Sequence, residues 1–246
     1  MHRLFVNPRN IKSDRISLHG ECHKKVRRVL RLKIEDTIYV FDGTGCEYLS
    51  QIVSLTPDEG ELKILKKDNP IRESPLEIHL GQALPKANKM NLIVQKAVEL
   101  GVFEVHPFSS ARTLPDYDGD RVIKRVRRWQ KIAQEASQQS GRARIPNVNL
   151  PVEFSQLLDL PPENCLKIVL QKEYSRDSLK TFLQSSQKKD CIFFLVGPEG
   201  GFTPEETARS MKHGFKPVGL GKRILRTETV AITFLSIIQY ELGDIY

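Results

Sequence analysis

Residues 191–196 read CIFFLV and run directly into residues 197–201, which read GPEGG. A short, uninterrupted apolar run of this kind is typical of a strand in a parallel sheet that is covered on both faces. A glycine-rich turn after such a strand lies where open α/β sheets bind ligands, because glycine lets the backbone approach a ligand closely. The stretch therefore predicts an α/β fold with a binding site at this turn. A tight strand-to-helix turn without a ligand is the plainer alternative.

Strands and helices alternate on both sides of this stretch. Further short apolar runs predict strands at 76–80, 103–108, 167–170 and 218–220. Apolar residues three or four positions apart predict helices around 90–98, 122–136 and 230–242. Another helix opens at Thr203, where Pro204 suits the first helical position and Glu206 completes a capping box. The alternation predicts a mostly parallel sheet with helices on both faces.

The first 70 residues have a different pattern. Apolar runs punctuated by glycine and aspartate predict closely spaced strands at 4–6, 15–18, 37–41, 48–53 and 61–65, which is typical of a small β-barrel. One helical turn interrupts them at 23–31, where Val26, Val29 and Leu30 fall on one face. A polar, proline-marked link follows at 68–75, so we expect domains at 1–72 and 73–246.

The chain is basic, with a formal net charge of +8, and its cations are clustered. Residues 24–33 and 121–131 each hold six lysines and arginines, and a third group lies at 222–226. One such cluster is usually a solvated helix face. Clusters in both expected domains fit an extended polyanion such as RNA better.

Several other classes of protein are disfavoured. The longest apolar run, 230–238, has about half the length of a membrane-spanning helix, so we expect a soluble, cytoplasmic protein. The cysteines form no C-x-x-C pair, which argues against a structural zinc site, and we expect no metal. Residues 197–201 lack the Rossmann spacing and Gly221-Lys222 lacks the Walker pattern, so a phosphate-binding nucleotide enzyme is a weak alternative.

Two further segments are dense in functional groups. Residues 219–229, GLGKRILRTET, place cations and a carboxylate around an apolar centre, which suits a ligand that is part adenine and part cation. The alternative is a helix cap with solvated charges. Residues 135–144, EASQQSGRAR, end a long helix with amides, hydroxyls and two arginines. Helix termination explains Gly141 but not the polar side chains before it.

Together these motifs resemble those of the RsmE family, which are SPOUT-class methyltransferases acting on 16S ribosomal RNA. Residues 197–201 and 220–229 look like the loops that bind S-adenosylmethionine (SAM) in that family. The resemblance extends over the whole chain, to segments 1–6 and 29–31 of a PUA-like domain and to Gln82, Lys89-Met90, 95–101 and 135–142. Departures are mild: Lys222 stands where many members have proline, and Val230 stands where a small residue is common and could tighten the cofactor pocket.

The resemblance implies a carboxy-terminal SPOUT domain with a deep trefoil knot, preceded by a PUA-like β-barrel. It also implies a homodimer that binds SAM near the dimer interface and methylates N3 of one uridine in 16S rRNA within the small ribosomal subunit. The cofactor-binding residues that it implies are Leu170, Gln171, Leu195, Val196, Gly197, Glu199, Gly200, Gly201, Leu220, Gly221, Arg223, Ile224, Leu225 and Thr229.

Uracil N3 becomes a nucleophile only after its proton leaves, and the negative charge then spreads onto O2 and O4. An arginine beside these oxygens would stabilise that charge, and the candidates are Arg142 and Arg226. Glu228 and water are the candidate bases, and the choice between them stays open. Since N3 lies on the pairing edge, the uridine must be unpaired or extruded. The residues expected to contact RNA are Arg3, Lys24, Lys25, Arg27, Arg28, Arg31, Gln139 and Arg144.

Two alternatives keep this fold. A non-catalytic ribosome assembly factor would bind RNA without SAM, and the intact glycine loops argue against it. A SPOUT enzyme for another RNA base or for a transfer RNA would share the cofactor loops, and segments 1–6 and 135–142 favour the RsmE-like target instead.

Overall fold

The computed structural model describes residues 2–70, 72–113, 119–172, 179–185 and 190–246. The chain forms two compact units. Unit 1 holds Met1–Glu73 together with Gln134–Ile145, and unit 2 holds Ser74–Ala133 and Pro146–Tyr246. The chain therefore passes between the units three times. The sequence pattern predicts only the first passage, because segment 134–145 carries no composition signal that separates it from its neighbours.

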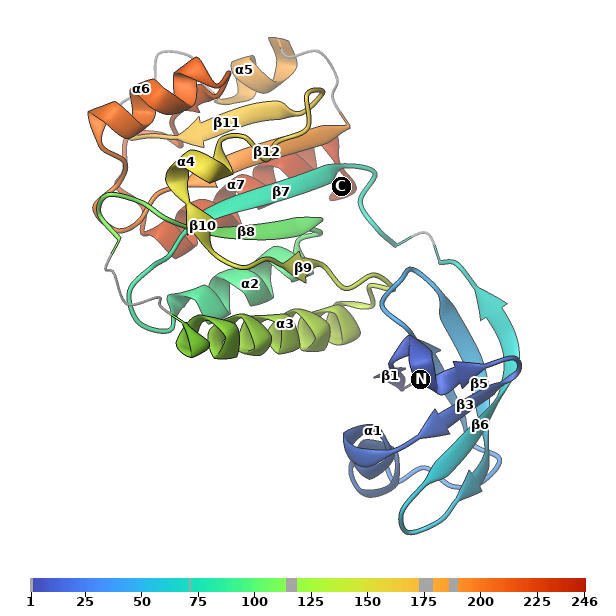
Figure 1. Ribbon diagram of the computed structural model, residues 1–246. Coiled ribbons are helices and arrows are strands. Elements are labelled where there is room, and N and C mark those ends of the chain that lie inside the picture. Colours follow the sequence, from blue (N-terminus) through green and yellow to red (C-terminus); the bar gives the residue numbers. More distant parts are fainter. Residues whose placement is uncertain (1, 71, 114–118, 173–178, 186–189) are drawn as a thin grey trace. The chain divides into compact units, whose positions relative to one another are not determined.

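Unit 1 is built on a sheet with the strand order β1-β4-β5-β6-β3-β2 (Figure 1). Neighbouring strands are antiparallel except β1 and β4, which are parallel. The strands are β1 (Arg3–Phe5), β2 (Ile11–Lys12), β3 (Arg15–Leu18), β4 (Thr37–Phe41), β5 (Glu47–Leu55) and β6 (Gly60–Asp68), and a 3-10 turn (Pro8–Asn10) precedes β2. The pairing of β5 with β6 shifts register at two places, and such irregularities bend a sheet.

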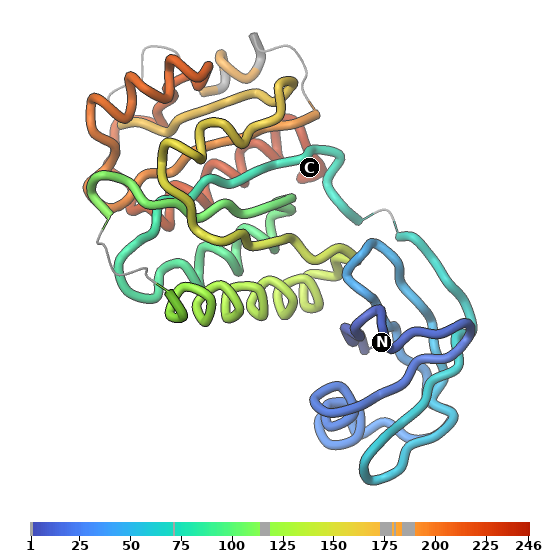
Figure 2. The backbone as a smooth tube through the Cα atoms, viewed as in Figure 1, coloured from blue at the N-terminus to red at the C-terminus, as the bar shows by residue number. Residues whose placement is uncertain are grey.

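The core of unit 1 follows the two-residue period of its strands. In β3, Ile16 and Leu18 are fully buried while Arg15 is exposed, and in β4 Ile38 and Val40 are fully buried. These side chains gather with others from β1, β5 and β6 into one apolar cluster. Figure 2 shows the backbone path of these strands. The predicted small β domain at the amino-terminal end is therefore present.

The predicted helical turn at 23–31 is present but wider than an α-helix. Helix α1 (Gly20–Lys24) continues into a π-helical turn (Lys25–Val29), which closes when Leu30 N–H donates to Lys25 O. Val26 is buried as expected, but Val29 is 70% exposed. Its predicted place on the buried face is wrong, because a π-turn holds more residues than an α-turn and rotates the side chain outward.

Unit 2 is built on a parallel sheet with the strand order β10-β8-β7-β12-β11-β13, and β9 also pairs with β8. The strands are β7 (Glu77–Ala83), β8 (Glu104–Ser109), β9 (Asn147–Val148), β10 (Val152–Glu153), β11 (Leu166–Leu170), β12 (Cys191–Val196) and β13 (Lys216–Val218). The CIFFLV strand, β12, lies between β7 and β11, so both its edges are hydrogen-bonded. The predicted parallel α/β sheet is confirmed.

Helices cover both faces of this sheet (Figure 1). They are α2 (Lys89–Glu99), α3 (Asp120–Ser140), α4 (Phe154–Leu157), α5 (Leu179–Ser185), α6 (Pro204–Lys212) and α7 (Thr227–Leu242). Consecutive phenylalanines of β12 serve opposite faces. Phe194 packs on Phe234 of α7, with ring centroids 4.8 Å apart, whereas Phe193 joins the cluster that contains Phe154 of α4. No helix among the described residues is long and apolar enough to cross a membrane.

Local signals predict the helix ends well. Helix α6 begins with the expected capping box, in which Thr203 and Glu206 satisfy each other's backbone N–H groups and Pro204 takes the first helical position. Helix α3 ends at Ser140, and Gly141 follows it with a φ of +85°, which glycine adopts without strain. The first part of α3 belongs to unit 2, and residues 134–140 belong to unit 1.

Candidate functional site

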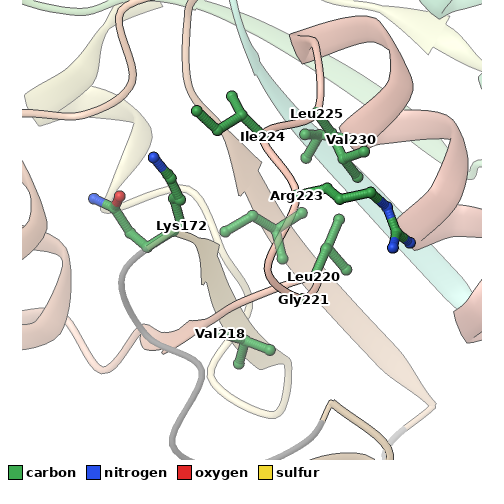
Figure 3. A pocket seen from close by; sticks show the side chains of 10 residues that line it. Lys172, Val218, Leu220, Gly221, Arg223, Ile224, Leu225 and Val230 are labelled. Carbon is green, nitrogen blue, oxygen red and sulfur yellow. The ribbon is translucent and has the colours of Figure 1, made fainter.

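A small cavity lies where β11 and β13 end and α7 begins (Figure 3). Its volume is about 90 Å³. Pockets that enclose a drug-sized ligand measure roughly 300 Å³ or more, so this cavity holds only part of such a molecule. Its walls are mostly aliphatic, and Lys172 and Arg223 enter from opposite sides. The lining residues are Leu170, Gln171, Lys172, Val218, Leu220, Gly221, Arg223, Ile224, Leu225 and Val230.

The parallel sheet brings these residues together. Leu170 of β11 pairs with Val218 of β13, and Gln171 N–H donates to Val218 O at 2.9 Å. Both strands therefore end at the same edge, and the loops that follow them share the cavity. Gly221 has a φ of +101°, a conformation that side chains other than hydrogen disfavour. Ile224 is 76% exposed, which leaves an apolar surface open to a ligand.

The cavity gathers part of the predicted cofactor set. Leu170, Gln171, Leu220, Gly221, Arg223, Ile224 and Leu225 line it. The predicted residues Leu195, Val196, Gly197, Glu199, Gly200, Gly201 and Thr229 are not among its lining residues. Two lining residues were missed, Lys172 and Val218, and Val218 is found only through its pairing with Leu170. Val230, named from the sequence as a residue that could tighten the cofactor pocket, also lines the cavity.

The glycine-rich turn after β12 is tied to the start of α7. Thr227 Oγ1 donates to Gly197 O at 2.7 Å, and Gln82 Nε2 of β7 donates to Thr227 Oγ1 at 3.0 Å. Within the turn, Gly201 N–H donates to Pro198 O at 2.9 Å, and Gly201 has a φ of +69°. The ends of β7 and β12 and the first residue of α7 therefore form one hydrogen-bonded corner.

Three charged side chains meet at this corner. Lys89 Nζ lies 2.7 Å from Glu199 Oε1 and 3.8 Å from Glu228 Oε2. Glu199 Oε1 also accepts a hydrogen bond from Lys86 N–H at 3.1 Å. Burial raises the pKa of Glu199, but these hydrogen bonds outweigh burial and bring the pKa below its usual value. Glu228 Oε2 is buried and has no hydrogen-bond partner among the described groups.

A second cavity of about 320 Å³ shares Gln171 with the first. Its lining residues are Arg112, Gln171, Phe202, Pro204, Thr207, Ala208 and Met211. Gln171 donates to Thr207 Oγ1, and Arg112 donates to Gly200 O, so the wall of this cavity is fixed to the glycine-rich turn. The two cavities flank Gln171 and together offer room for a larger ligand than the first cavity alone.

The candidate catalytic residues are placed differently. Glu228 lies in the first turn of α7 with its side chain 14% exposed, and Arg226 is exposed at the N-cap of the same helix. Arg142 belongs to unit 1, where its guanidinium lies 2.6 Å from Glu73 Oε2 and is 7% exposed. The predicted role of Arg142 beside a reacting base stays a prediction.

Segment 135–144 holds unit 1 together. Gln138 Oε1 accepts a hydrogen bond from Phe5 N–H at 3.2 Å. The Arg3 guanidinium donates to the backbone carbonyls of Ser137, Gln138 and Arg142 at 3.1 to 3.4 Å. The Arg3 side chain is only 13% exposed. The predicted contact of Arg3 with RNA is therefore not supported, because its donors are engaged within the protein.

The other residues predicted to contact RNA lie at the surface of unit 1. Lys24, Arg27, Arg28, Arg31, Gln139 and Arg144 are exposed, and Lys25 is half-buried. Unit 2 has its own basic surface on α3, where Arg121, Lys124, Arg127 and Arg128 are exposed. Each unit therefore presents the cations that a polyanion would contact.

A buried histidine pair lies elsewhere in the sheet of unit 2. His79 Nδ1 of β7 lies 3.1 Å from His106 Nε2 of β8, and burial lowers the pKa of both, that of His106 to about 4. These histidines and Glu104 could face a metal ion. The Asn149 amide, however, donates to Glu104 at 3.0 Å and lies 3.1 Å from His106 Nδ1. A metal-bound His106 would need to donate from that nitrogen, so the group fits a hydrogen-bonded network better.

Comparison with known proteins gives the same picture for both parts of the chain. The model of a family described as an RNA methyltransferase domain matches residues 72–239, and that of an RNA methyltransferase PUA domain matches residues 26–65. The ribosomal RNA small subunit methyltransferase E of Buchnera aphidicola subsp. Schizaphis graminum is 34% identical over 94% of this chain and 92% of its own length. The protein of the same name from Bacillus subtilis is 32% identical over 92% of this chain and 90% of its own length.

Solved structures agree with these relatives. The ribosomal RNA small subunit methyltransferase E of Neisseria gonorrhoeae, bound to S-adenosyl methionine, superposes with a TM-score of 0.89 at 32% identity and covers 100% of both chains. A putative methyltransferase from Legionella pneumophila in complex with SAM also reaches a TM-score of 0.89 at 32% identity, covering 99% of this chain and 98% of its own. The PUA-like unit and the parallel sheet thus match structures of this kind. The chain belongs to the ribosomal RNA small subunit methyltransferase E family.

Proposed function

We propose that this protein transfers a methyl group from SAM to N3 of a uridine in the 16S rRNA of the small ribosomal subunit. The observation that carries the proposal is the cavity at the ends of β11 and β13, which is built from the loops that resemble the SAM loops of the family. Relatives named as small subunit rRNA methyltransferases, one of them bound to SAM, support the cofactor and the class of substrate. The choice of N3 rests on the family resemblance.

The residues at the site fit SAM. Aliphatic side chains around the first cavity suit a purine ring, and the exposed Ile224 offers it further apolar contact. SAM also carries a sulfonium and an ammonium group. The carboxylates of Glu199 and Glu228 lie at the neighbouring corner, where Glu228 Oε2 is buried without a hydrogen-bond partner. Negative charge at this place attracts a cationic ligand.

Bound SAM supplies an electrophilic methyl group, and the residues of the chain supply the rest of the mechanism. The Glu228 carboxylate, whose side chain is 14% exposed in the first turn of α7, accepts the N3 proton of the uridine. Arg226, two residues earlier at the helix N-cap, stabilises the charge that develops on the uracil oxygens. The N3 electron pair then forms the new bond to carbon as the bond from carbon to sulfur breaks.

The basic surface of unit 1 is the proposed RNA contact. Replacing Arg27 and Arg28 with Glu should weaken RNA affinity about tenfold and reduce its salt dependence, because phosphate contacts release counterions. SAM affinity should not change. The matched control is the pair Arg9→Glu and Lys12→Glu, which makes the same charge change at exposed positions outside the cluster. Equal loss of RNA and SAM affinity would indicate misfolding and contradict a local RNA contact.

Three further properties belong to this proposal. We infer from the family resemblance a homodimer with SAM near its interface, a trefoil knot in unit 2 and action in the cytoplasm. The dimer is tested by light scattering coupled to gel filtration, where a particle of twice the 28.1 kDa chain mass is expected. A particle of the chain mass would contradict it.

The experiment that tests the reaction incubates the protein with methyl-labelled SAM and small ribosomal subunits from a strain that lacks the equivalent enzyme. Mass spectrometry then locates the modified base. We expect 3-methyluridine at one position of 16S rRNA. Binding of SAM without label in the subunit would redirect the proposal to another RNA. A protein that does not bind SAM would favour an assembly factor that kept the fold.

A further inference from the structure

Lys89 opens helix α2, and its ammonium group lies beside two carboxylates that come from different elements. Glu199 belongs to the glycine-rich turn after β12, and Glu228 belongs to the first turn of α7. We propose that Lys89 is a positioning residue for methyl transfer, which ties the glycine-rich turn to the start of α7 and holds the Glu228 carboxylate in place. The proposal rests on the proposed function, because it takes Glu228 as the acceptor of the uridine proton.

The link to the glycine-rich turn is held at two points. Glu199 Oε1 accepts hydrogen bonds from Lys89 Nζ at 2.7 Å and from Lys86 N–H at 3.1 Å. Lys89 and Glu199 are 30% and 28% exposed, so the pair is partly shielded from water and should be stronger than a surface ion pair. Met90, the next residue of α2, is buried and anchors the start of the helix. The position of the glycine-rich turn therefore depends on α2.

The link to Glu228 is electrostatic. Glu228 Oε2 is buried, and no described group donates a hydrogen bond to it. The Lys89 ammonium lies 3.8 Å from this oxygen, and the attraction between the opposite charges holds the Glu228 side chain in position. Removing the charge of Lys89 should therefore release the Glu228 carboxylate from this position.

Lys96 provides the matched control on the same helix. Its ammonium also pairs with a carboxylate at 2.6 Å, but the partner is Glu99 of α2 itself, three positions further along. This pair joins no other element. Replacing either lysine with methionine removes one cation from α2, yet only Lys89→Met removes the ion pairs that join α2 to Glu199 and to Glu228.

The experiment compares Lys89→Met, Lys89→Arg and Lys96→Met in the full-length protein. Calorimetry measures SAM affinity, and single-turnover methylation of small ribosomal subunits measures the rate of methyl transfer. For Lys89→Met we expect a rate loss of about 10- to 100-fold, because the Glu228 carboxylate is no longer held in place. SAM affinity should fall by about three- to tenfold, because the turn loses its anchor. Lys89→Arg should restore most of the rate, and Lys96→Met should match the wild type.

A double-variant comparison shows whether Lys89 acts through Glu228. In a protein that already carries Glu228→Gln, adding Lys89→Met should cause little further loss of the methylation rate, because the carboxylate that Lys89 holds is gone. An unchanged rate for Lys89→Met alone, or equal losses for Lys89→Met and Lys96→Met, would overturn the proposal. A wild-type protein that labels no subunit would instead sink the proposed reaction. Independently of that outcome, unchanged SAM affinity in Lys89→Met would overturn the proposed link between Lys89 and the glycine-rich turn.

Discussion

Residues 220–225 and residues 137–142 look alike as sequence, but the structure uses them in opposite ways. Both segments lie next to a helix end and combine a glycine with arginine. In the first, Ile224 is 76% exposed and the segment lines a cavity. In the second, Ser137 and Arg142 are buried, and their contacts lie within unit 1. An apolar side chain left in solvent marks the ligand site better than a concentration of polar groups does.

The largest expected effect is a loss of stability, and it tests residues 137–142. Arg142→Met should lower the free energy of unfolding by about 3 kcal/mol, because it leaves the Glu73 carboxylate without its buried partner. Denaturant unfolding and hydrogen exchange of β1 report the loss. The exposed neighbour Arg144 is the control, and Arg144→Met should change stability by less than about 0.5 kcal/mol. A stable Arg142→Met protein that cannot methylate rRNA would return Arg142 to the reaction.

Lowering the pH is a second way to change the stability of the protein without changing residues 220–225. Burial lowers the pKa of His106 to about 4, below the ordinary value of 6.5, and also lowers that of His79. Between about pH 6.5 and 4 the unfolded chain therefore binds protons that the folded chain does not. The free energy of unfolding should fall by roughly 1–3 kcal/mol as the pH drops through this window. Melting curves across the window test this, with exposed His19→Gln as the control and His106→Phe expected to flatten the dependence.

In residues 220–225 we expect the reverse of the Arg142 result: a substitution should change SAM affinity and leave stability unchanged. Ile224→Ala should weaken SAM binding about fivefold, because less apolar surface is covered when the ligand binds. Its stability should stay within about 0.5 kcal/mol, since the side chain is already exposed. Val29→Ala is the matched control, a β-branched residue that is 70% exposed in unit 1, and it should change neither quantity. Calorimetry and thermal unfolding give both numbers. A stability loss without an affinity loss would remove Ile224 from the site.

The smallest expected effect is a change in SAM affinity, and it tests one residue of the cavity wall. Val230 lines the cavity, and the family resemblance implies a smaller residue at this position. Val230→Ala should widen the cavity and raise SAM affinity about twofold, at a cost in stability below about 1 kcal/mol. Competition binding with a labelled cofactor resolves a difference of this size. Weaker binding would mean that the Val230 methyl groups contact the cofactor directly.

Local signals carried most of the fold prediction. An uninterrupted apolar run gave the bounds of β12, and Thr203 with Glu206 marked the start of α6. The misses come from non-local contacts or from altered helix geometry. Segment 134–145 joins unit 1 through hydrogen bonds with β1, more than a hundred positions away in the chain. Val29 turns outward because a π-turn replaces an α-turn, and apolar spacing does not report that change.

The candidate site was only partly predictable for the same reason. The loop after β13 was recognisable because it follows a strand and carries its own motif, whereas Leu170 and Gln171 after β11 came only from the family resemblance. The corner of Lys89, Glu199 and Glu228 was not recognisable, since it exists only because β7 lies next to β12. Strand order is a property of the whole sheet, and no short stretch of sequence encodes it.

Helix α3 contributes residues to both units, so a single domain boundary near residue 73 does not describe the chain. The first two thirds of the helix, residues 120–133, belong to unit 2, and its last third, residues 134–140, belongs to unit 1. Cutting the gene after residue 73 would therefore not yield two modules. The amino-terminal fragment would lack the carbonyls that receive Arg3, and the carboxy-terminal fragment would carry Arg142 without Glu73. Denaturation of either half should weaken the other, so the protein should melt as a single cooperative body whose stability rises when the cofactor binds.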